Sequence, residues 1–356
     1  MRRERAREWQ AGQIADRLLP DRHDPGACRM ERVSQALRIG AIAGMVATAA
    51  AAHAADSIRV AVQKTGTFAW ELDVIRAHGL DRQIDLKIEV TELANPEAGR
   101  IALRGGAADI IVSDWLWVTR ERSLGAKLVF YPYSSALGAV MVPAAAAIET
   151  LADLKGRKLA VAGGPLDKSW LFLQAAMKQD GIDIKKQATI VYGAPALLAA
   201  KAVQREVDAT LNYWNFCAAL EAKGLRRLAG VEEFMPQLGA KGRPALLGYV
   251  FDESWAGRNR ELVARFITVT RKAKEILATS DAEWERIARL VAPGDAASLK
   301  IYRDRYREGI PRRPIAEEEA DARVLYQVLA TAGGSDLVGS ARELQAGTFY
   351  RAVAGD

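Results

Sequence analysis

Short strand-like runs alternate with longer helix-like segments along most of this chain, and this alternation limits the fold more than any other feature. The apolar strand-like runs are residues 58–62, 86–90, 109–112, 128–133, 158–161, 188–192 and 209–212. Helix-like segments separate them, such as residues 67–79, which end at a glycine, and a segment that starts at Asn95-Pro96-Glu97. Strands that alternate with helices form mostly parallel sheets covered by helices. The pattern restarts near residue 145, so we predict two α/β lobes.

The last third of the chain has a different pattern, because residues 253–332 are mostly helical with one apolar face. Residues 242–251 precede these helices and are predicted to form a strand that returns to the first lobe. We therefore expect a discontinuous first lobe, residues 55–140 plus 245–356, and a second lobe, residues 141–244.

The first 54 residues are predicted to be absent from the working protein. Residues 30–38 carry positive charge, residues 39–52 contain no charged residue, and Ala52-His53-Ala54 is a small-x-small triplet. This order is typical of a secretory signal peptide that is cleaved near Ala54. The apolar run has 14 residues, too few for a transmembrane helix. We interpret Met30 as the true start and residues 1–29 as an over-extended reading frame, with a disordered leader as the alternative.

Removal of this segment lowers the net charge of the protein and weakens the case for a nucleic-acid partner. The full chain carries 50 basic and 44 acidic residues, a net charge of +6. The segment holds nine basic and six acidic residues, which leaves 41 and 38 and a net charge of about +3. This small excess does not favour nucleic acid as a partner. One histidine, His78, and one cysteine, Cys217, remain, so neither an internal disulfide nor a His/Cys metal site is expected.

The loops that follow the predicted strands contain most of the tryptophans. These loops are residues 64–70, 113–117, 134–138, 162–170 and 212–215. Ligands of open α/β sheets bind at the carboxyl ends of the strands, where these loops begin. Five of the seven tryptophans after residue 54 lie in them: Trp70, Trp115, Trp117, Trp170 and Trp214. Indole rings bind organic ligands by stacking and cation–π contact, and the alternative is that they pack between helix and sheet.

Polar groups in the same loops add to this predicted site. Gly163-Gly164 precedes a predicted helix, whose N-terminus favours an anion, and Lys168 adds a positive charge. The spacing matches neither a Walker A loop nor a dinucleotide fingerprint, and the two glycines equally suit a tight turn. Hydroxyl groups that suit either a ligand or a helix cap come from Thr65, Thr67, Ser113, Ser134 and Ser135.

The residues favour binding over catalysis. His78 is the one histidine available as a general base, and it lies near the end of a predicted helix. Cys217 has apolar neighbours, which is typical of a buried and unreactive thiol, and no serine elbow motif occurs. Paired carboxylates or a hard-cation site stay open through Glu71, Asp73, Asp114 and Asp167, although the chain has no compact metal-binding loop.

Four segments resemble the periplasmic substrate-binding proteins of ABC importers, in particular the nitrate/sulfonate/taurine and thiamine-pyrimidine-precursor branch. They are IRVAVQKTGTFAW (58–70), ALRGGAADIIVSD (102–114), IETLADLKGRKLAVAGG (148–164) and REVDATLNYWNF (205–216). The family typically shows a DLKGKK-strand-GG step at the entry to the second lobe. It also shows a G-x-VDA step before a ligand-facing aromatic residue, and here Arg205-Glu206 replaces the glycine of that step.

The resemblance implies a type II periplasmic-binding-protein fold, an α/β fold in which each lobe is a mostly parallel sheet flanked by helices and the ligand cleft lies between the lobes. It implies a periplasmic monomer without catalysis or cofactor, which captures a small organic solute and delivers it to an ABC permease in the inner membrane. A sulfonate- or taurine-like ligand is expected, since the few cations in these loops, Lys64 and Lys168, disfavour an inorganic anion.

Three alternatives stay open: a pyrimidine- or thiamine-precursor-binding protein, a scavenger of a metal ion or metal complex, and a pyrimidine-synthase-like enzyme. The loops and the resemblance together predict these ligand contacts: Thr65, Gly66, Thr67, Phe68, Trp70, Ser113, Asp114, Trp115, Ser134, Gly163, Gly164, Pro165, Asp167, Lys168, Tyr213 and Trp214.

Overall fold

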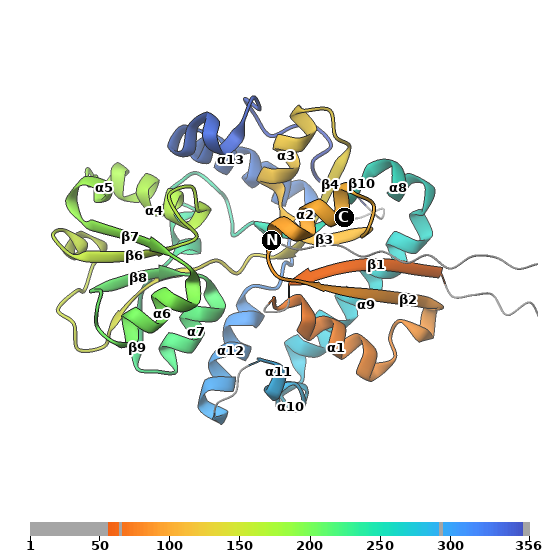
Figure 1. The fold of residues 1–356 in the computed structure, drawn as a ribbon, viewed down its shortest axis with the longest axis horizontal. Coiled ribbons are helices and arrows are strands. Elements are labelled where there is room, and N and C mark those ends of the chain that lie inside the picture. The colour runs from red at the N-terminus through yellow and green to blue at the C-terminus, as the bar shows by residue number, and fades with distance from the viewer. Residues whose placement is uncertain (1–55, 64–65, 292–294, 352–356) are drawn as a thin grey trace, which may run out of the picture. The chain divides into compact units, whose positions relative to one another are not determined.

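The computed structural model describes residues 56–63, 66–291 and 295–351. These residues form two lobes, each with a five-stranded mixed sheet and flanking helices (Figure 1). The predicted leader and signal peptide, residues 1–54, lie outside the described residues, as do Lys64 and Thr65. In the described part of the chain, no helix has the length and apolar character needed to span a membrane.

The first sheet has the strand order β2-β1-β3-β10-β4. Its strands are β1 (Asp56–Gln63), β2 (Leu86–Leu93), β3 (Ile110–Asp114), β4 (Leu128–Ser134) and β10 (Leu247–Asp252). β1 runs parallel to β2 and β3, whereas β10 runs antiparallel to β3 and β4. The strand expected to return to the first lobe therefore lies inside this sheet, between two strands from much earlier in the chain.

The second sheet has the strand order β7-β6-β8-β5-β9. Its strands are β5 (Ala139–Pro143), β6 (Lys158–Ala162), β7 (Thr189–Gly193), β8 (Ala209–Asn212) and β9 (Leu225–Gly230). β6 runs parallel to β7 and β8, and β5 runs antiparallel to β8 and β9. Each sheet is thus mostly parallel, as the sequence predicted, because four of its strands run in one direction and the strand that enters from the other lobe, β10 or β5, runs against them.

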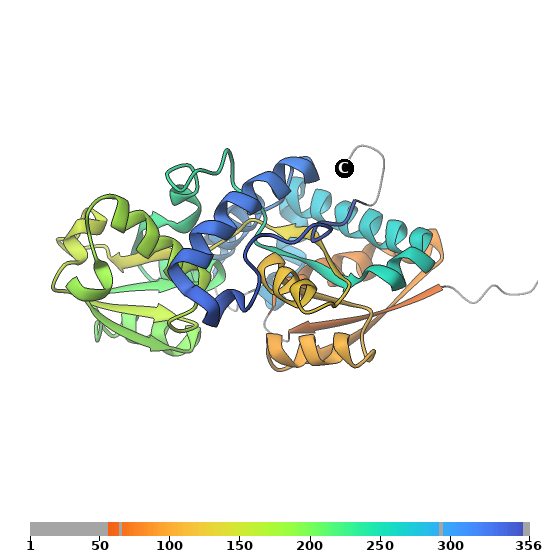
Figure 2. The same cartoon turned by 90° about the horizontal axis from the view of Figure 1, so that it is seen from above.

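The helices cover the faces of the two sheets (Figures 1 and 2). They are α1 (Phe68–His78), α2 (Pro96–Arg104), α3 (Trp115–Ser123), α4 (Lys168–Gln179), α5 (Ile184–Gln187), α6 (Pro195–Val203), α7 (Trp214–Glu221), α8 (Glu253–Arg258), α9 (Arg260–Thr279), α10 (Asp281–Arg286), α11 (Ala288–Val291), α12 (Ala296–Glu308) and α13 (Ile315–Val338). Three short 3₁₀ helices are η1 (Arg82–Ile84), η2 (Leu151–Leu154) and η3 (Val231–Phe234).

The C-terminal helices contact both lobes. α9 packs on α1, as expected for helices that return to the first lobe. α12 packs on α7, and α13 packs on both α4 and α3. Because α4 and α7 follow strands of the second sheet, the last part of the chain helps to join the two lobes, which the sequence did not predict.

Local signals fix where the helices near the cleft begin and end. The side chain of Asn95 accepts a hydrogen bond from the N–H of Ala98 (2.9 Å), and Pro96 occupies the first turn of α2. α1 ends at Gly79, whose φ of 61° is the left-handed conformation that glycine adopts without steric cost. Asn95 thus fixes the start of α2, and Gly79 fixes the end of α1.

Candidate ligand-binding site

An ion pair joins the two lobes at the carboxyl ends of their strands. Asp114 is the last residue of β3 in the first sheet, and Lys168 is the first residue of α4, which follows β6 of the second sheet. Nζ of Lys168 lies 3.2 Å from Oδ2 of Asp114. Both residues were predicted as ligand contacts, and the structure brings them together.

The carboxylate of Asp114 is buried, with 4% of its surface exposed, and both of its oxygens are engaged. Oδ1 caps α3 by accepting a hydrogen bond from the N–H of Trp117 (2.8 Å), while Oδ2 also accepts one from Nη2 of Arg100 (3.2 Å). Burial raises the pKa of Asp114, but the positive charges of Lys168 and Arg100 outweigh burial and hold the pKa below its ordinary value. The group therefore stays ionised at neutral pH.

Arg100 is a member of this cluster that the sequence analysis did not identify. Its Nε lies 3.4 Å from Oγ of Ser113, and its Cζ lies 5.0 Å from the ring centroid of Trp117. The signal that points to it is the helix start at Asn95, because α2 begins directly after β2 and its first turns lie at the edge of the sheet where Asp114 lies. Ser113, Asp114, Arg100 and Lys168 thus form one polar cluster.

The second lobe contributes a tight turn ahead of α4. Gly163 and Gly164 have φ values of 84° and 108°, so the turn interpretation of these glycines is confirmed. A Cβ atom at Gly163 would lie 2.4 Å from the hydroxyl of Tyr213, so a side chain does not fit there. Pro165 is exposed in the same turn.

The N-terminus of α4 is occupied by the chain's own carboxylate. Oδ1 of Asp167 accepts hydrogen bonds from the N–H groups of Ser169 (2.9 Å) and Trp170 (3.3 Å), and Tyr213 donates its hydroxyl to Oδ2 (3.3 Å). Burial raises the pKa of Asp167 despite these hydrogen bonds and the neighbouring Lys168. An anion at this helix start, as the sequence suggested, would have to replace Asp167.

The predicted polar groups of the first lobe that lie outside this cluster have local partners. Oγ1 of Thr67 is 2.9 Å from the hydroxyl of Tyr133, and the N–H of Gly66, which is half-buried, donates to the carbonyl of Gln63 (2.9 Å). Oγ of Ser134 accepts a hydrogen bond from the N–H of Ala136 (3.2 Å). Among the hydrogen bonds of the described residues, these groups do not connect to the Asp114–Lys168 pair.

The predicted tryptophans divide into two groups. Trp115 and Trp170 are completely enclosed by protein, which matches the alternative that such rings pack in the core. Nε1 of Trp115 has no hydrogen-bond partner among the described residues, and it belongs to the residue that follows Asp114. Trp70 of the first lobe and Trp214 of the second lobe meet edge to face, with ring centroids 5.8 Å apart.

Phe68 and Glu71 lie in the core of the first lobe. Phe68 packs edge to face on Tyr249, with centroids 5.1 Å apart. The fully buried carboxylate of Glu71 accepts hydrogen bonds from the hydroxyls of Tyr249 (2.8 Å) and Tyr306 (2.7 Å) and from Nζ of Lys274. Glu71 therefore ties α1 to β10, α9 and α12 and is not available to a ligand or metal.

The candidate catalytic groups have structural partners. Nε2 of His78 is 3.0 Å from Oε2 of Glu283. Cys217 is fully buried, its Sγ donates to the carbonyl of Asn212 (3.2 Å), and burial raises the pKa of its thiol to about 12. The thiolate needed for nucleophilic attack is thus absent at neutral pH.

The acidic residues that left a metal site open do not come together. Glu71 pairs with Lys274, Asp73 with Arg286, and Asp114 and Asp167 are engaged as described above. Among the described residues, no group of three or more His, Cys, Asp or Glu side chains is placed to bind a metal ion.

The two mixed sheets, with polar groups from both lobes meeting at the carboxyl ends of their strands, define a periplasmic-binding-protein fold. The model of the family described as "NMT1/THI5 like" matches residues 76–283, more than half of the chain. The chain belongs to this family.

Solved structures of the same fold include binding proteins of ABC importers. The periplasmic aliphatic sulphonate binding protein SsuA of Escherichia coli is 22% identical over 80% of this chain and 94% of that protein, with a TM-score of 0.64. The alkanesulfonate-binding protein SsuA of Xanthomonas axonopodis pv. citri, bound to MOPS, is 21% identical over 83% and 98%, with a TM-score of 0.62.

A more distant structure is the ligand-binding component of an ABC-type import system from Staphylococcus aureus with zinc bound. It is 13% identical over 80% of this chain and 99% of that protein, with a TM-score of 0.56. The comparison with curated proteins found no match.

Proposed function

We propose that this protein is the periplasmic solute-binding component of an ABC-type importer. It binds a small organic solute between its two lobes and delivers the solute to a permease in the inner membrane, without chemical change. Family membership and the shared fold with sulfonate-binding proteins support this role. The buried thiol of Cys217 and the contact of His78 with Glu283 also fit a protein that binds its ligand and does not transform it.

The observation that carries the ligand proposal is the charge balance at the lobe junction. Lys168 and Arg100 supply two positive charges, and Asp114 and Asp167 supply two carboxylates. A zwitterion of the taurine type matches this set, because its sulfonate pairs with the two cations while its ammonium pairs with a carboxylate.

A heterocyclic pyrimidine precursor is the second candidate ligand. Asp167 accepts a hydrogen bond from Tyr213, and this carboxylate would equally accept hydrogen bonds from an aminopyrimidine. Tyr213 and Trp214 are consecutive, and the Trp214 ring already stands against Trp70 across the lobe junction. These rings favour a flat ligand, which binds by stacking.

The proposal includes the predicted organisation of the chain. Residues 1–54 are a leader and signal peptide removed near Ala54, residues 55–140 and 245–356 form the first lobe, and residues 141–244 form the second. The ligand contacts are those predicted from the sequence, with Arg100 added. The protein acts as a monomer.

Isothermal titration calorimetry of the protein purified from the periplasm tests the ligand class. We expect taurine to bind with one site per chain, ethanesulfonate to bind more weakly because it lacks the ammonium group, and nitrate to give no heat. Binding of 4-amino-5-hydroxymethyl-2-methylpyrimidine in place of the sulfonates would instead support the second candidate. Absence of binding by all of these compounds would contradict the proposed ligand classes.

Lys168→Ala tests the site itself. We expect this variant to bind taurine at least about tenfold more weakly, since it loses a charged hydrogen-bond donor at a partly buried position. Lys185→Ala is the matched control, because Lys185 is an exposed lysine of the same lobe. Taurine affinity that is unchanged in Lys168→Ala would place the ligand elsewhere in the molecule.

A further inference from the structure

Asp167 differs from the other acids predicted near the cleft, because no ion pair of the described residues includes it. The other three each pair with a cation: Glu71 with Lys274, Asp73 with Arg286, and Asp114 with Lys168. The carboxylate of Asp167 instead accepts hydrogen bonds from neutral groups, the N–H groups of Ser169 and Trp170 and the hydroxyl of Tyr213. Its negative charge therefore has no opposite charge in direct contact within the described part of the chain.

The two cations of the polar cluster already have carboxylate partners. Nζ of Lys168 and Nη2 of Arg100 each lie 3.2 Å from Oδ2 of Asp114. Nη1 of Arg100 also lies 3.5 Å from Oε2 of Glu97. Two cations thus face two carboxylates, and the charge of Asp167 is the excess.

Asp167 lies at the lobe junction, where a bound solute would reach it. The next residue, Lys168, forms its ion pair across the junction. Tyr213, which donates its hydroxyl to Asp167, directly precedes Trp214, whose ring meets a tryptophan of the first lobe. The side chain of Asp167 is half-buried, so it is held in place and still reaches the cleft.

Oδ2 of Asp167 has capacity for a further hydrogen bond. A carboxylate offers about four acceptor positions, and this one receives three hydrogen bonds, of which the bond to Oδ2 is long at 3.3 Å. A Cβ atom at Gly163 would lie 2.8 Å from Oδ2, so the glycine leaves room for this oxygen. Burial raises the pKa of Asp167, which means that the ionised carboxylate would be stabilised by a positive neighbour.

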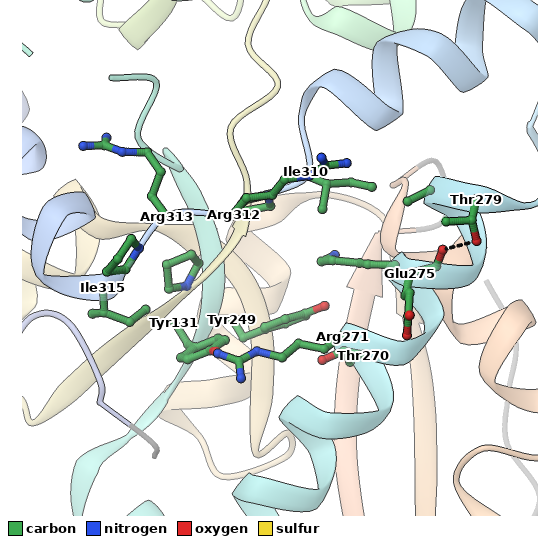
Figure 3. A pocket seen from close by; sticks show the side chains of 15 residues that line it. Tyr131, Tyr249, Thr270, Arg271, Glu275, Thr279, Ile310, Arg312, Arg313 and Ile315 are labelled. Carbon is green, nitrogen blue, oxygen red and sulfur yellow. Dashed lines mark hydrogen bonds between the residues drawn. The ribbon is translucent and has the colours of Figure 1, made fainter. Parts of the chain in front are cut away.

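Charges elsewhere in the first lobe are compensated within the protein. A cavity of about 610 Å³ is bounded by β4, β10, α9 and the segment between α12 and α13 (Figure 3). Two of its cations have carboxylate partners, since Lys274 pairs with Glu71 and Arg313 with Asp321. Asp167 lacks such a partner, which makes it the better candidate for contact with a charged group of a ligand.

We propose that Asp167 determines the specificity of the cleft by accepting hydrogen bonds from a nitrogen group of the solute, either an ammonium or an amino group. The inference rests on the proposed solute-binding function and narrows it, because alkanesulfonates without such a group become poor ligands. Their sulfonate cannot use the first N–H groups of α4, which Asp167 occupies, and its charge is repelled by the carboxylate.

Two matched pairs of compounds test this inference by isothermal titration calorimetry. The members of each pair differ by one nitrogen group: taurine and ethanesulfonate, and 4-amino-5-hydroxymethyl-2-methylpyrimidine and the same pyrimidine without its amino group. In the pair that binds, we expect the compound with the nitrogen group to bind the wild type at least about tenfold more tightly.

Asp167→Asn should abolish most of this preference. Asparagine keeps the cap of α4, because its side-chain oxygen still accepts the hydrogen bonds from Ser169 and Trp170, but it lacks the charge. We expect the affinity for the compound with the nitrogen group to fall at least about tenfold, while the affinity of its partner stays equal or rises. Asp183→Asn is the matched control, since Asp183 is an exposed aspartate of the same lobe.

Three results would overturn the inference. Equal affinity of the wild type for both members of the pair that binds is the first. The second is a preference that survives in Asp167→Asn after circular dichroism has shown that the variant is folded. Both results leave the proposed solute-binding function in place. The third, no heat from any of the four compounds, contradicts the proposed ligand classes as well.

Discussion

Arg205 adopts a backbone conformation that suits glycine. Its φ of 60° lies in the left-handed region, which it shares with Asp85 among the described non-glycine residues. Val207-Asp208-Ala209 aligns with the VDA of the family's G-x-VDA step, so Arg205 stands where the family has glycine. Arg205 thus adopts the backbone conformation that the family's glycine would adopt. A residue with a Cβ atom in this conformation destabilises the folded state by about 1 kcal/mol.

Arg205→Gly is therefore expected to stabilise the protein by about 0.5–1 kcal/mol, because it relieves the strain at φ 60°. The side chain is exposed and forms no hydrogen bond or ion pair with the described residues, so little is lost. Urea unfolding monitored by circular dichroism measures the change. Arg205→Ala keeps the strain and serves as control; an equal gain in both variants would show that the backbone is not the cause.

At the scale of elements, α13 holds the segment by which the chain returns to the first lobe. Oε2 of Glu318 accepts a hydrogen bond from the N–H of Ala245 (2.5 Å). The carboxylate of Asp321 accepts hydrogen bonds from the N–H groups of Lys241 (2.8 Å) and Gly242 (3.0 Å). Two acids in the first turns of one helix thus fix the backbone just before β10, where it passes between the lobes.

Glu318 makes this anchor sensitive to pH. Burial raises the pKa of Glu318 to about 7, helped by Asp321 and Glu317 and opposed by the hydrogen bond from Ala245 and by Arg313. Since the folded pKa lies above the unfolded value of 4.5, the stabilisation is complete below pH 4.5 and is lost as pH rises through about 7. The free energy of unfolding should fall by up to about 3 kcal/mol over this range.

Glu318→Gln should remove this pH dependence, because glutamine accepts the same hydrogen bond without ionising. We expect its free energy of unfolding to exceed that of the wild type at pH 8 by more than at pH 5, measured by urea unfolding at both values. Glu343→Gln, at an exposed position, is the control for loss of one carboxylate. A parallel decline with pH in Glu318→Gln and the wild type would assign the effect to other groups.

At the scale of the whole molecule, the sequence predicted what local signals determine. The alternation of runs identified most strands, and the cap at Asn95 and the stop at Gly79 were placed correctly. The sequence did not predict β5 or β9, and β9 (LRRLAG) carries two arginines, which break the apolar pattern of a strand. The antiparallel direction of β5 follows from the path of the chain between the lobes, which no local signal encodes.

For the site, too, the sequence predicted individual residues but not how the fold brings them together. The sequence predicted Asp114 and Lys168 as separate ligand contacts. No spacing in the sequence shows that these residues, 54 positions apart, form an ion pair. Arg100 lies within α2 and not in a loop that follows a strand, so the loop pattern did not predict it.

The Lys168–Asp114 pair gives a test of lobe closure, because it is a polar contact between the two lobes at the cleft. Removing one partner would leave an unpaired charge, so the double variant Asp114→Asn/Lys168→Met is the better probe, in which Arg100 keeps its ion pair with Glu97 (3.5 Å). Asparagine keeps the cap of α3, since its side-chain oxygen still accepts the hydrogen bond from the N–H of Trp117. If the pair holds the lobes together without ligand, its removal shifts the population toward an open form.

Small-angle X-ray scattering of the unliganded protein measures this shift. We expect a larger radius of gyration for the double variant than for the wild type, with unchanged circular dichroism. Lys201→Met/Glu206→Gln removes an ion pair formed within the second lobe and should leave the radius unchanged. If the double variant and this control scatter identically, other contacts hold the lobes closed, first among them the Trp70–Trp214 ring contact and the packing of α12 on α7.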